Sequence, residues 1–270
     1  MRLKGILAAT LALLFALSAQ AAAQSDAPAS SCLAIARAVP DTHFVSLSTA
    51  SLERNEVRIT FLGHASFHIE SPGGVSVVTD YAGYLPPDIR PDVATMNRAH
   101  RSHYTDTPDP AIAHVLRGWS TDGTPARHHF EIRDMLIRNV PTDIRSWGGG
   151  RIPAGNSIFI FEVAGTCIGH LGHLHHELGP DRIAQIGRLD VVMVPVDGSF
   201  TMAQPAMVKV LRELRARLVL PMHYFGPDTL NRFLAQMRDD FAIEISPVPQ
   251  TVVSLATLPR DPTVRVLPGY

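Results

Sequence analysis

"NSIFIFEVAGTCIGHLGHLHH", residues 156–176, joins two apolar runs to a cluster of histidines. Ala164 and Gly165 separate the runs, and such a pair between apolar segments predicts a β-hairpin. The histidines, among them His170 and His173, follow the second run directly. A strand that ends in imidazoles is a common way to fix metal ligands, because the ends of neighbouring strands meet at one edge of a sheet.

Two other strand-like runs also end in histidines. "NRAHRSHYTD", residues 97–106, follows the apolar run "PDVATM" and carries His100 and His103, and "LVLPMHYFG", residues 218–226, delivers His223. A lone histidine is usually a surface or core residue, but three separate strand-end groups favour a metal site. Imidazole ligands suit zinc, iron, nickel or copper, and zinc is the default for a hydrolase without redox chemistry.

The remaining sequence predicts an α/β fold. Residues 57–80 have strand chemistry, with β-branched and aromatic residues in partial alternation. Later runs alternate between apolar strands and the amphipathic segments 179–189, 204–217 and 228–240. This order predicts sheets flanked by helices. Residues 128–140 fit either a strand pair or a helix.

The first residues predict export. Arg2 and Lys4 precede an apolar run, residues 6–19, which small residues follow, and this is the pattern of a secretory signal peptide. The run is too short for a membrane span of about 20 residues, so no stable membrane insertion is expected. We therefore expect a signal peptide at residues 1–23 and a location in a bacterial periplasm.

Residues 24–55 are rich in alanine and serine and predict a weakly structured segment, which leaves residues 56–270 as a single domain. The formal net charge of −1 argues against nucleic acid or an anionic membrane as the main partner and leaves a small-molecule substrate. Cys32 and Cys167 are the two cysteines. They can pair in an oxidising compartment, or Cys167 can be a buried free thiol.

Four motifs together resemble the metallo-β-lactamase fold superfamily, in particular the branch of ascorbate-phosphate-lactonase-like zinc-dependent hydrolases. The resemblance covers Val57 to Phe225 and implies a four-layer αββα sandwich. Its motifs are specific for the fold and much less so for a substrate. They are "ITFLGHASFHIE" (59–70), "GTCIGHLGHLHHELG" (165–179), "IGRLDVVMVPVDGSFTM" (186–202) and "VLPMHYF" (219–225).

The chain departs from the family pattern at several ligand positions. The family loop His-x-His-x-Asp-His falls on Arg98, His100, Ser102 and His103, so that two of its four ligands remain. His173 falls where the family usually has a metal-bridging aspartate.

Other positions keep the family residue or replace it. A later family histidine falls near Asp143, whereas His223 matches the last ligand. His64 matches a residue that lines the family site without binding metal, and Asp197 lies in a loop that borders it. The resemblance therefore implies metal ligands at His100, His103, His173 and His223.

Charge favours one metal ion over two. Both aspartates of the usual two-metal site are replaced, and an inward-pointing Arg98 would add positive charge. A dication and a guanidinium about 4 Å apart repel by about 8 kcal/mol at an effective dielectric of 20. Unless Asp143 or Asp197 moves in, a single ion, with zinc ahead of iron or another divalent metal, is the simpler arrangement.

We therefore expect a metal-dependent hydrolase that attacks an ester, lactone or phosphoester with an activated water. Asp197 or Asp143 would orient or deprotonate that water, although Asp197 can equally be a turn-forming residue. Arg98 would hold an anionic group of the substrate, and His64 would line the site. The alternatives are a non-catalytic metal- or ligand-binding protein and a redox-active iron protein on the same fold.

Overall fold

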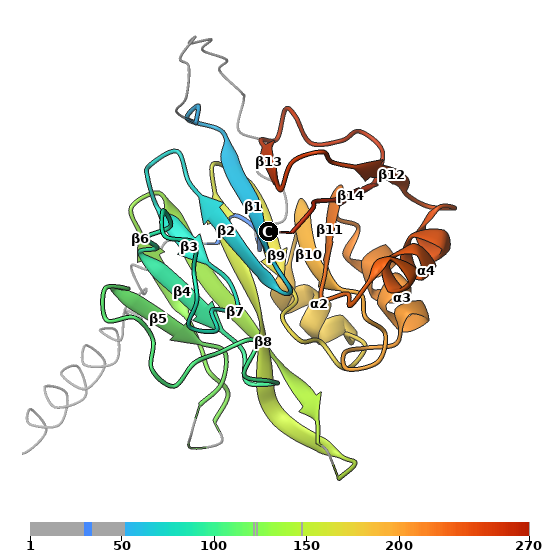
Figure 1. Ribbon diagram of the computed structural model, residues 1–270, viewed down its shortest axis with the longest axis horizontal. Coiled ribbons are helices and arrows are strands. Elements are labelled where there is room, and N and C mark those ends of the chain that lie inside the picture. Colours follow the sequence, from blue (N-terminus) through green and yellow to red (C-terminus); the bar gives the residue numbers. More distant parts are fainter. Residues whose placement is uncertain (1–29, 34–51, 121, 123, 147, 270) are drawn as a thin grey trace, which may run out of the picture.

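Two β-sheets pack face to face, and helices cover the outer face of the larger sheet (Figure 1). The computed structural model describes residues 30–33, 52–120, 122, 124–146 and 148–269. The predicted signal peptide and most of the predicted weakly structured segment lie outside the described residues. Within the described part of the chain, no helix is long and apolar enough to cross a membrane.

The smaller sheet has six strands in the order β13-β1-β2-β3-β4-β5. Its β1 and β2 form an antiparallel hairpin with a turn at His64 and Ala65, so the stretch with strand chemistry, residues 57–80, contains three strands. The strands are β1 (Val57–Gly63), β2 (Ser66–Glu70), β3 (Ser76–Val78), β4 (Val93–Met96), β5 (His114–Arg117) and β13 (Gln250–Val253).

The larger sheet has eight strands in the order β12-β14-β11-β10-β9-β8-β7-β6. β9, β10 and β11 run parallel, so their carboxyl ends lie at one edge. The strands are β6 (His129–Ile132), β7 (Met135–Arg145), β8 (Arg151–Val163), β9 (Thr166–His170), β10 (Val191–Pro195), β11 (Leu218–Met222), β12 (Ala242–Ile245) and β14 (Thr263–Val266).

Two sequence predictions can be compared directly with this sheet. The β8–β9 hairpin is confirmed, and both Ala164 and Gly165 have positive φ angles of 50° and 73°, as a two-residue hairpin turn requires. Residues 128–140 form the strand pair β6–β7 and not a helix. Side chains alternate along β8: Phe159 and Phe161 face the smaller sheet, whereas Ile158 and Ile160 face the helices.

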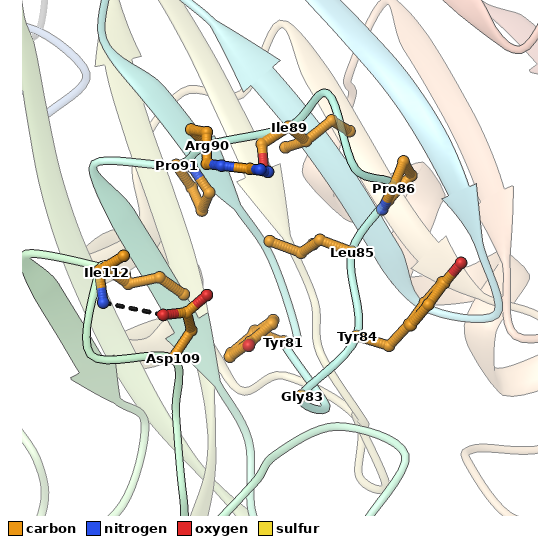
Figure 2. A pocket seen from close by; sticks show the side chains of 11 residues that line it. Tyr81, Gly83, Tyr84, Leu85, Pro86, Ile89, Arg90, Pro91, Asp109 and Ile112 are labelled. Atoms are coloured by element: carbon orange, nitrogen blue, oxygen red, sulfur yellow. Dashed lines mark hydrogen bonds between the residues drawn. The ribbon is translucent and has the colours of Figure 1, made fainter.

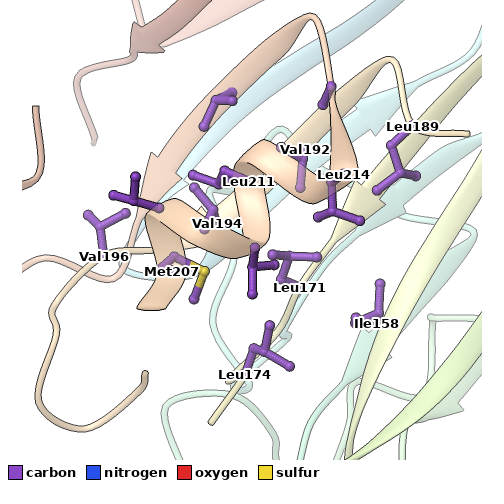
Figure 3. Packing of buried hydrophobic residues seen from close by; sticks show 14 of the residues in the cluster. Ile158, Leu171, Leu174, Leu189, Val192, Val194, Val196, Met207, Leu211 and Leu214 are labelled. Atoms are coloured by element: carbon purple, nitrogen blue, oxygen red, sulfur yellow. The ribbon is translucent and has the colours of Figure 1, made fainter. Parts of the chain in front are cut away.

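Three described helices pack on the larger sheet: α2 (Pro180–Ile186), α3 (Gln204–Leu214) and α4 (Pro227–Met237). Figure 3 shows Met207 and Leu211 of α3 over Val192 and Val194 of β10. Each of the three helices has a proline in its first turn, where the backbone N–H that proline lacks would have no partner within the helix. The three amphipathic segments predicted from sequence are therefore confirmed as helices.

The α/β fold predicted from sequence is confirmed, with one difference in the layers. The expected sandwich has helices outside both sheets, whereas every described helix lies outside the larger one. The outer face of the smaller sheet is covered by loops instead, which place Tyr81, Ile89 and Ile112 over Ala94 and Met96. These loops are rich in proline, which disfavours a continuous helix.

A disulfide between Cys32 and Cys167 joins the N-terminal segment to β9, so the alternative of a buried free thiol is wrong. The attachment is also polar, because the Ser30 hydroxyl donates to the Glu162 carboxylate over 2.5 Å. Arg138 donates to the same carboxylate over 2.6 Å and is itself nearly buried. Residues 30–33 are thus fixed to the domain.

Candidate metal centre

Loops from both sheets meet at one edge and bring five histidines together. His103 follows β4 of the smaller sheet, and His173 and His223 follow β9 and β11 of the larger one. The rings of these three have centroids 4.9–5.1 Å apart. His64 and His100 lie beside them, at 4.3 Å from His223 and 4.8 Å from His173. The convergence expected from the three strand-end groups is therefore present in the structure.

His103 is oriented by Asp80, which follows β3. The two side chains are fully buried, and His103 Nδ1 lies 2.6 Å from Asp80 Oδ2. Asn97 Nδ2 donates to the other oxygen, Asp80 Oδ1, over 2.9 Å. A carboxylate only accepts, so His103 carries its proton on Nδ1 and presents a lone pair on Nε2.

His223 is oriented in the same way by Asp197, which follows β10. His223 Nδ1 lies 3.1 Å from Asp197 Oδ1. The backbone N–H groups of Ser199, Phe200 and Thr201 donate to Asp197 Oδ2 over 2.6–3.2 Å. His223 therefore also keeps its proton on Nδ1 and leaves a lone pair on Nε2.

The two free nitrogens face each other: His103 Nε2 and His223 Nε2 are 3.2 Å apart. Two lone pairs at that separation repel unless a proton or a metal cation lies between them. Imidazole nitrogens that bind a tetrahedral zinc ion at 2.0–2.1 Å are roughly 3.3 Å apart. The separation thus fits two ligands of one metal ion. Metal-binding histidines usually donate their other ring N–H to a carboxylate, as both rings do here with a buried aspartate.

His64 is the third member of this group. A donor atom from each of His64, His103 and His223 lies within 4.8 Å of the others. His64 occupies the β1–β2 turn with φ of 50°, a left-handed conformation, and its carbonyl accepts from the His223 backbone N–H over 2.6 Å. Burial, together with the nearby His223 and His103, lowers the pKa of His64 to about 4. The ring is therefore neutral, as a metal ligand must be.

Electrostatics favour a cation at this point. Burial alone would raise the pKa of Asp80, but neighbouring His170 and His103 lower it overall. Burial opposes ionisation of Asp197 too, but hydrogen bonds from His223, Thr201 and Ser199 lower its pKa. Two ionised carboxylates therefore lie behind the rings of His103 and His223.

His173 and His100 flank the group without belonging to it. His173 Nε2 is buried and has no hydrogen-bond partner within the described part of the chain. An unpartnered buried nitrogen on a ring that contacts His100, His103 and His223 indicates a ligand or substrate atom at this position. His100 is partly buried, and this burial is the main reason that its pKa is lowered. The predicted set His100, His103, His173 and His223 thus overlaps the compact group at His103 and His223.

Three residues with predicted catalytic roles lie elsewhere or have other partners. Arg98 has an exposed side chain, so it brings no positive charge among the imidazoles. Asp143 accepts from Ala154 N over 3.0 Å and lies 3.6 Å from Arg151, outside the histidine group. The Asp197 carboxylate accepts hydrogen bonds from His223 and from the backbone of its own loop. This geometry favours a role in positioning His223, and not in contacting a water.

Sequence reasoning missed Asp80, although it had the same signal as the histidines, a polar side chain directly after a predicted strand. The chain bends at Asp80, directly after β3, where the backbone adopts a left-handed φ of 45°.

His170 contacts backbone groups and does not join the histidine group: its Nε2 donates to the Ala65 carbonyl over 2.8 Å, and its Nδ1 accepts from the Gly172 N–H over 3.2 Å. It thus ties the β1–β2 turn to the loop after β9.

Phenylalanines border the centre on the solvent side. Phe200 and Phe225 are 49% and 62% exposed, although they are large apolar residues. Their rings meet edge to face at 5.6 Å, and Phe200 also lies 5.9 Å from His100. Phe225 lies 5.3 Å from His223. We refer to Phe200 and Phe225 as the aromatic rim.

Two hollows on the surface lie apart from this group. A cavity of about 310 Å³ opens between the loop after β3 and residues 109–112, and Figure 2 shows Tyr81, Leu85 and Ile89 around it. No histidine lines it. A second cavity of about 230 Å³ is lined by residues of β7, β8 and α2, among them Asp143, and by the loop between β9 and α2, which includes His176.

Comparison with known proteins gives the same fold and a common description of activity. Residues 58–223 match the family model of the β-lactamase superfamily domain. A UPF0173 metal-dependent hydrolase of Pyrococcus furiosus is 27% identical over 192 residues, which cover 62% of this chain and 84% of that protein. A UPF0173 metal-dependent hydrolase of Pyrococcus abyssi is 29% identical over 194 residues, with the same coverage.

A solved structure supports the fold. A protein of Thermotoga maritima, assigned to the zinc-dependent hydrolases of the metallo-β-lactamase superfamily, aligns with a TM-score of 0.56 at 27% identity. The alignment covers 78% of this chain and 97% of that one.

Proposed function

Because the chain belongs to the metallo-β-lactamase superfamily, with a family match over residues 58–223, we propose that it is a metal-dependent hydrolase. We further propose that His64, His103 and His223 hold one ion, with zinc ahead of iron or another divalent metal. Relatives that share 27–29% identity are named metal-dependent hydrolases, which supports the class of reaction. A set of three imidazoles leaves a coordination position open for a water or substrate, as catalytic zinc sites require.

One observation carries the proposal: the Nε2 atoms of His103 and His223 face each other at 3.2 Å while buried carboxylates hold both Nδ1 atoms. Asp80 and Asp197 keep the two rings in the tautomer that a metal requires and supply the negative charge that attracts a cation. The low pKa of His64 keeps the third ring neutral. A divalent metal, when bound, lowers the pKa of a coordinated water toward neutrality and so supplies hydroxide for attack on a carbonyl or phosphoryl group.

A single ion is supported by what stands at the other family positions. Ser102 replaces an aspartate of the family loop and lies 3.1 Å from His64 Nε2. Asp143, where another ligand is expected, pairs with Arg151. Ser102 and His173 stand where the family has the aspartates that balance two dications, so one ion fits the remaining charge.

The aromatic rim supports a small-molecule substrate with an apolar part. Exposed phenylalanine rings beside the histidines offer apolar surface that water does not favour. Arg98, expected to hold an anionic group, is exposed. We therefore favour esters and lactones with an apolar group over phosphoesters.

We also propose that the protein works after export, in an oxidising compartment such as a periplasm. The Cys32–Cys167 disulfide supports this, since such bonds persist mainly outside the reducing cytosol. The predicted signal peptide supports it independently.

The test combines metal analysis with hydrolysis assays on the purified mature protein. We expect about one bound metal per chain and turnover of apolar esters or lactones that chelation abolishes. His103→Ala should lose both metal and turnover. His129→Ala, which changes a largely exposed histidine on β6, is the matched control and should keep both.

Two results would count against the proposal. Absence of bound metal after loading, or turnover that survives His103→Ala, would contradict it. One bound metal without turnover across esters, lactones and phosphodiesters would instead favour the alternative, a non-catalytic metal-binding protein.

A further inference from the structure

A chain of hydrogen bonds runs from β7 to the unpartnered nitrogen of His173. It begins at Arg145, the last residue of β7, whose backbone N–H donates to His175 Nδ1 over 2.7 Å. The Arg145 side-chain Nε–H points at the same nitrogen over 3.3 Å. Two donors that meet at His175 Nδ1 require a lone pair there, so His175 carries no proton on Nδ1.

The next bond passes this constraint to His173. Every imidazole that is not doubly deprotonated carries at least one proton, so with a lone pair on Nδ1 the proton of His175 sits on Nε2. His175 Nε2 contacts His173 Nδ1 and must donate to it. His173 Nδ1 is therefore an acceptor and bears a lone pair. The single proton of His173 consequently lies on Nε2.

We propose that His173 presents an N–H to the metal centre and acts as a hydrogen-bond donor to a substrate oxygen, not as a metal ligand. This inference rests on the proposed function and assigns a role within the same site. It sets His173 apart from His103 and His223, whose Nδ1 atoms face carboxylates and whose Nε2 atoms are free to bind metal. The three buried rings thus divide into two ligands and one donor.

The donor has a direct chemical use. When a carbonyl or phosphoryl group is attacked, negative charge develops on its oxygen, and a fixed N–H in a buried site stabilises that charge. Where the family usually has a metal-bridging aspartate, this chain has a donor, which supplies part of the positive field that a second metal ion would have given. The loss of the aspartate and the gain of a donor are then parts of one change.

Arg145 and Asn156 keep the donor in place. The Arg145 guanidinium donates to the carbonyls of Ser199, Phe200 and Thr201 over 2.6–2.8 Å. The His173 backbone N–H donates to the Asn156 side chain over 2.7 Å. For His173 to bind metal through Nε2, its proton would have to move to Nδ1, and the contacts to His175 and Arg145 would then bring donors against donors.

The first test is the tautomeric state in the metal-free mature protein. Two-bond ¹⁵N–¹H correlation spectra of the imidazoles distinguish a protonated Nδ1 from a protonated Nε2, and a His173→Gln spectrum assigns the His173 signals. We expect His173 and His175 as Nε2–H tautomers, and His103 and His223 as Nδ1–H tautomers. A His173 ring that carries its proton on Nδ1 overturns the proposal.

The second test separates ligand from donor by zinc titration of three variants. His173→Leu removes the donor, whereas His173→Gln places an amide N–H near the position of Nε2. We expect both to bind zinc within about 3-fold of the wild type, whereas His103→Ala loses about 100-fold or more. Comparable losses in His173→Gln and His103→Ala overturn the proposal, and this comparison holds even if His173→Leu fails to fold.

Turnover gives a further readout where a substrate is found. We expect kcat to fall about 100- to 1000-fold in His173→Leu, the range for loss of one oxyanion donor, with KM less changed and partial recovery in His173→Gln. Unchanged kcat in His173→Leu contradicts the donor role. If the wild type hydrolyses nothing, the proposed function fails, while the tautomers and zinc affinities still decide whether His173 is a ligand.

Discussion

Among residues that are not proposed metal ligands, Asp80 is expected to have the largest influence on zinc affinity. Its carboxylate holds His103 in the metal-binding tautomer, and both side chains are fully buried. We expect Asp80→Asn to weaken zinc binding about 10- to 100-fold, the usual effect of removing such a partner. Isothermal titration of the folded variant measures this.

Asp143→Asn is the matched control for that measurement, because it makes the same chemical change on a side chain that pairs with Arg151 outside the histidine group. Its zinc affinity should stay within about 3-fold of the wild type. Equal losses in the two variants would mean that Asp143 also supports the metal.

The buried imidazoles also make a prediction about pH. In the folded protein burial lowers the pKa of both His64 and His175 to about 4, whereas in the unfolded chain both titrate near about 6.5. The unfolded chain therefore takes up more protons between these values, so the stability of the metal-free protein falls as the pH drops from about 6.5 to about 4. Below that range the contribution levels off, because both states are protonated.

Urea denaturation of the metal-free protein at a series of pH values measures this slope. Carboxylates such as Glu162, whose pKa is lowered in the folded protein, add a slope of the same sign in the lower part of this range, so a comparison between variants isolates the histidines. A double variant, His64→Gln with His175→Gln, should have a shallower slope than the wild type. A free energy of unfolding that stays constant from about pH 7 to about pH 4.5 would contradict the buried, neutral state of these rings.

At the scale of elements, the disulfide fixes a segment that its composition alone describes poorly. Residues 30–33 lie in a stretch predicted to be weakly structured, yet Cys32 is bonded to Cys167 across 135 positions. We expect the double variant Cys32→Ser, Cys167→Ala to lose about 2–4 kcal/mol of stability, which lowers the melting temperature by roughly 5–15 °C for a domain of this size.

Calorimetry with and without a reductant checks the assignment of this loss. Reduction should lower the melting temperature of the wild type toward that of the double variant and leave the double variant unchanged. A double variant as stable as the oxidised wild type would show that the attachment of the N-terminal segment contributes nothing to the fold.

The aromatic rim lies on the loops after β10 and β11 and should set substrate preference. We expect Phe225→Ala to raise KM for esters with a long apolar chain about 10-fold, since part of a phenylalanine's burial energy is lost, and to change KM for acetyl esters little. Tyr84→Ala is the matched control, because Tyr84 is 82% exposed and lines the other cavity. Equal effects on short and long chains would contradict the role of the rim.

Secondary-structure elements and the histidines at strand ends could be predicted from sequence because both follow local patterns. The β8–β9 hairpin and the three helices have clear periodicity or turn residues, and His103 and His223 follow apolar runs. The pairing of Asp80 with His103 could not be predicted, since it depends on the bend after β3 and the loop after β4 meeting in space. The inward turn of His64, in contrast to the exposed Arg98, is likewise set by backbone geometry that a pattern of residue types does not contain.

At the scale of the whole molecule, the centre exists only where the two sheets meet. Asp80 and His103 come from the smaller sheet, and Asp197 and His223 come from the larger one. Each sheet thus supplies one proposed ligand together with the carboxylate that orients it, and the smaller sheet also supplies His64 from the β1–β2 turn. The apolar core between the sheets, with Phe61, Phe67 and Phe159, therefore fixes the distance between the ligands as well as the stability of the fold.

Anomalous diffraction from crystals of the zinc-loaded protein tests the central claim most directly, since it counts the ions and identifies their ligands together. We predict one peak per chain, at about 2.0–2.1 Å from the Nε2 atoms of His103 and His223, with the His64 ring as the third ligand. His173 should lie outside this bonding distance. Two peaks, or a single ion bound by His173 and His100, would contradict the account.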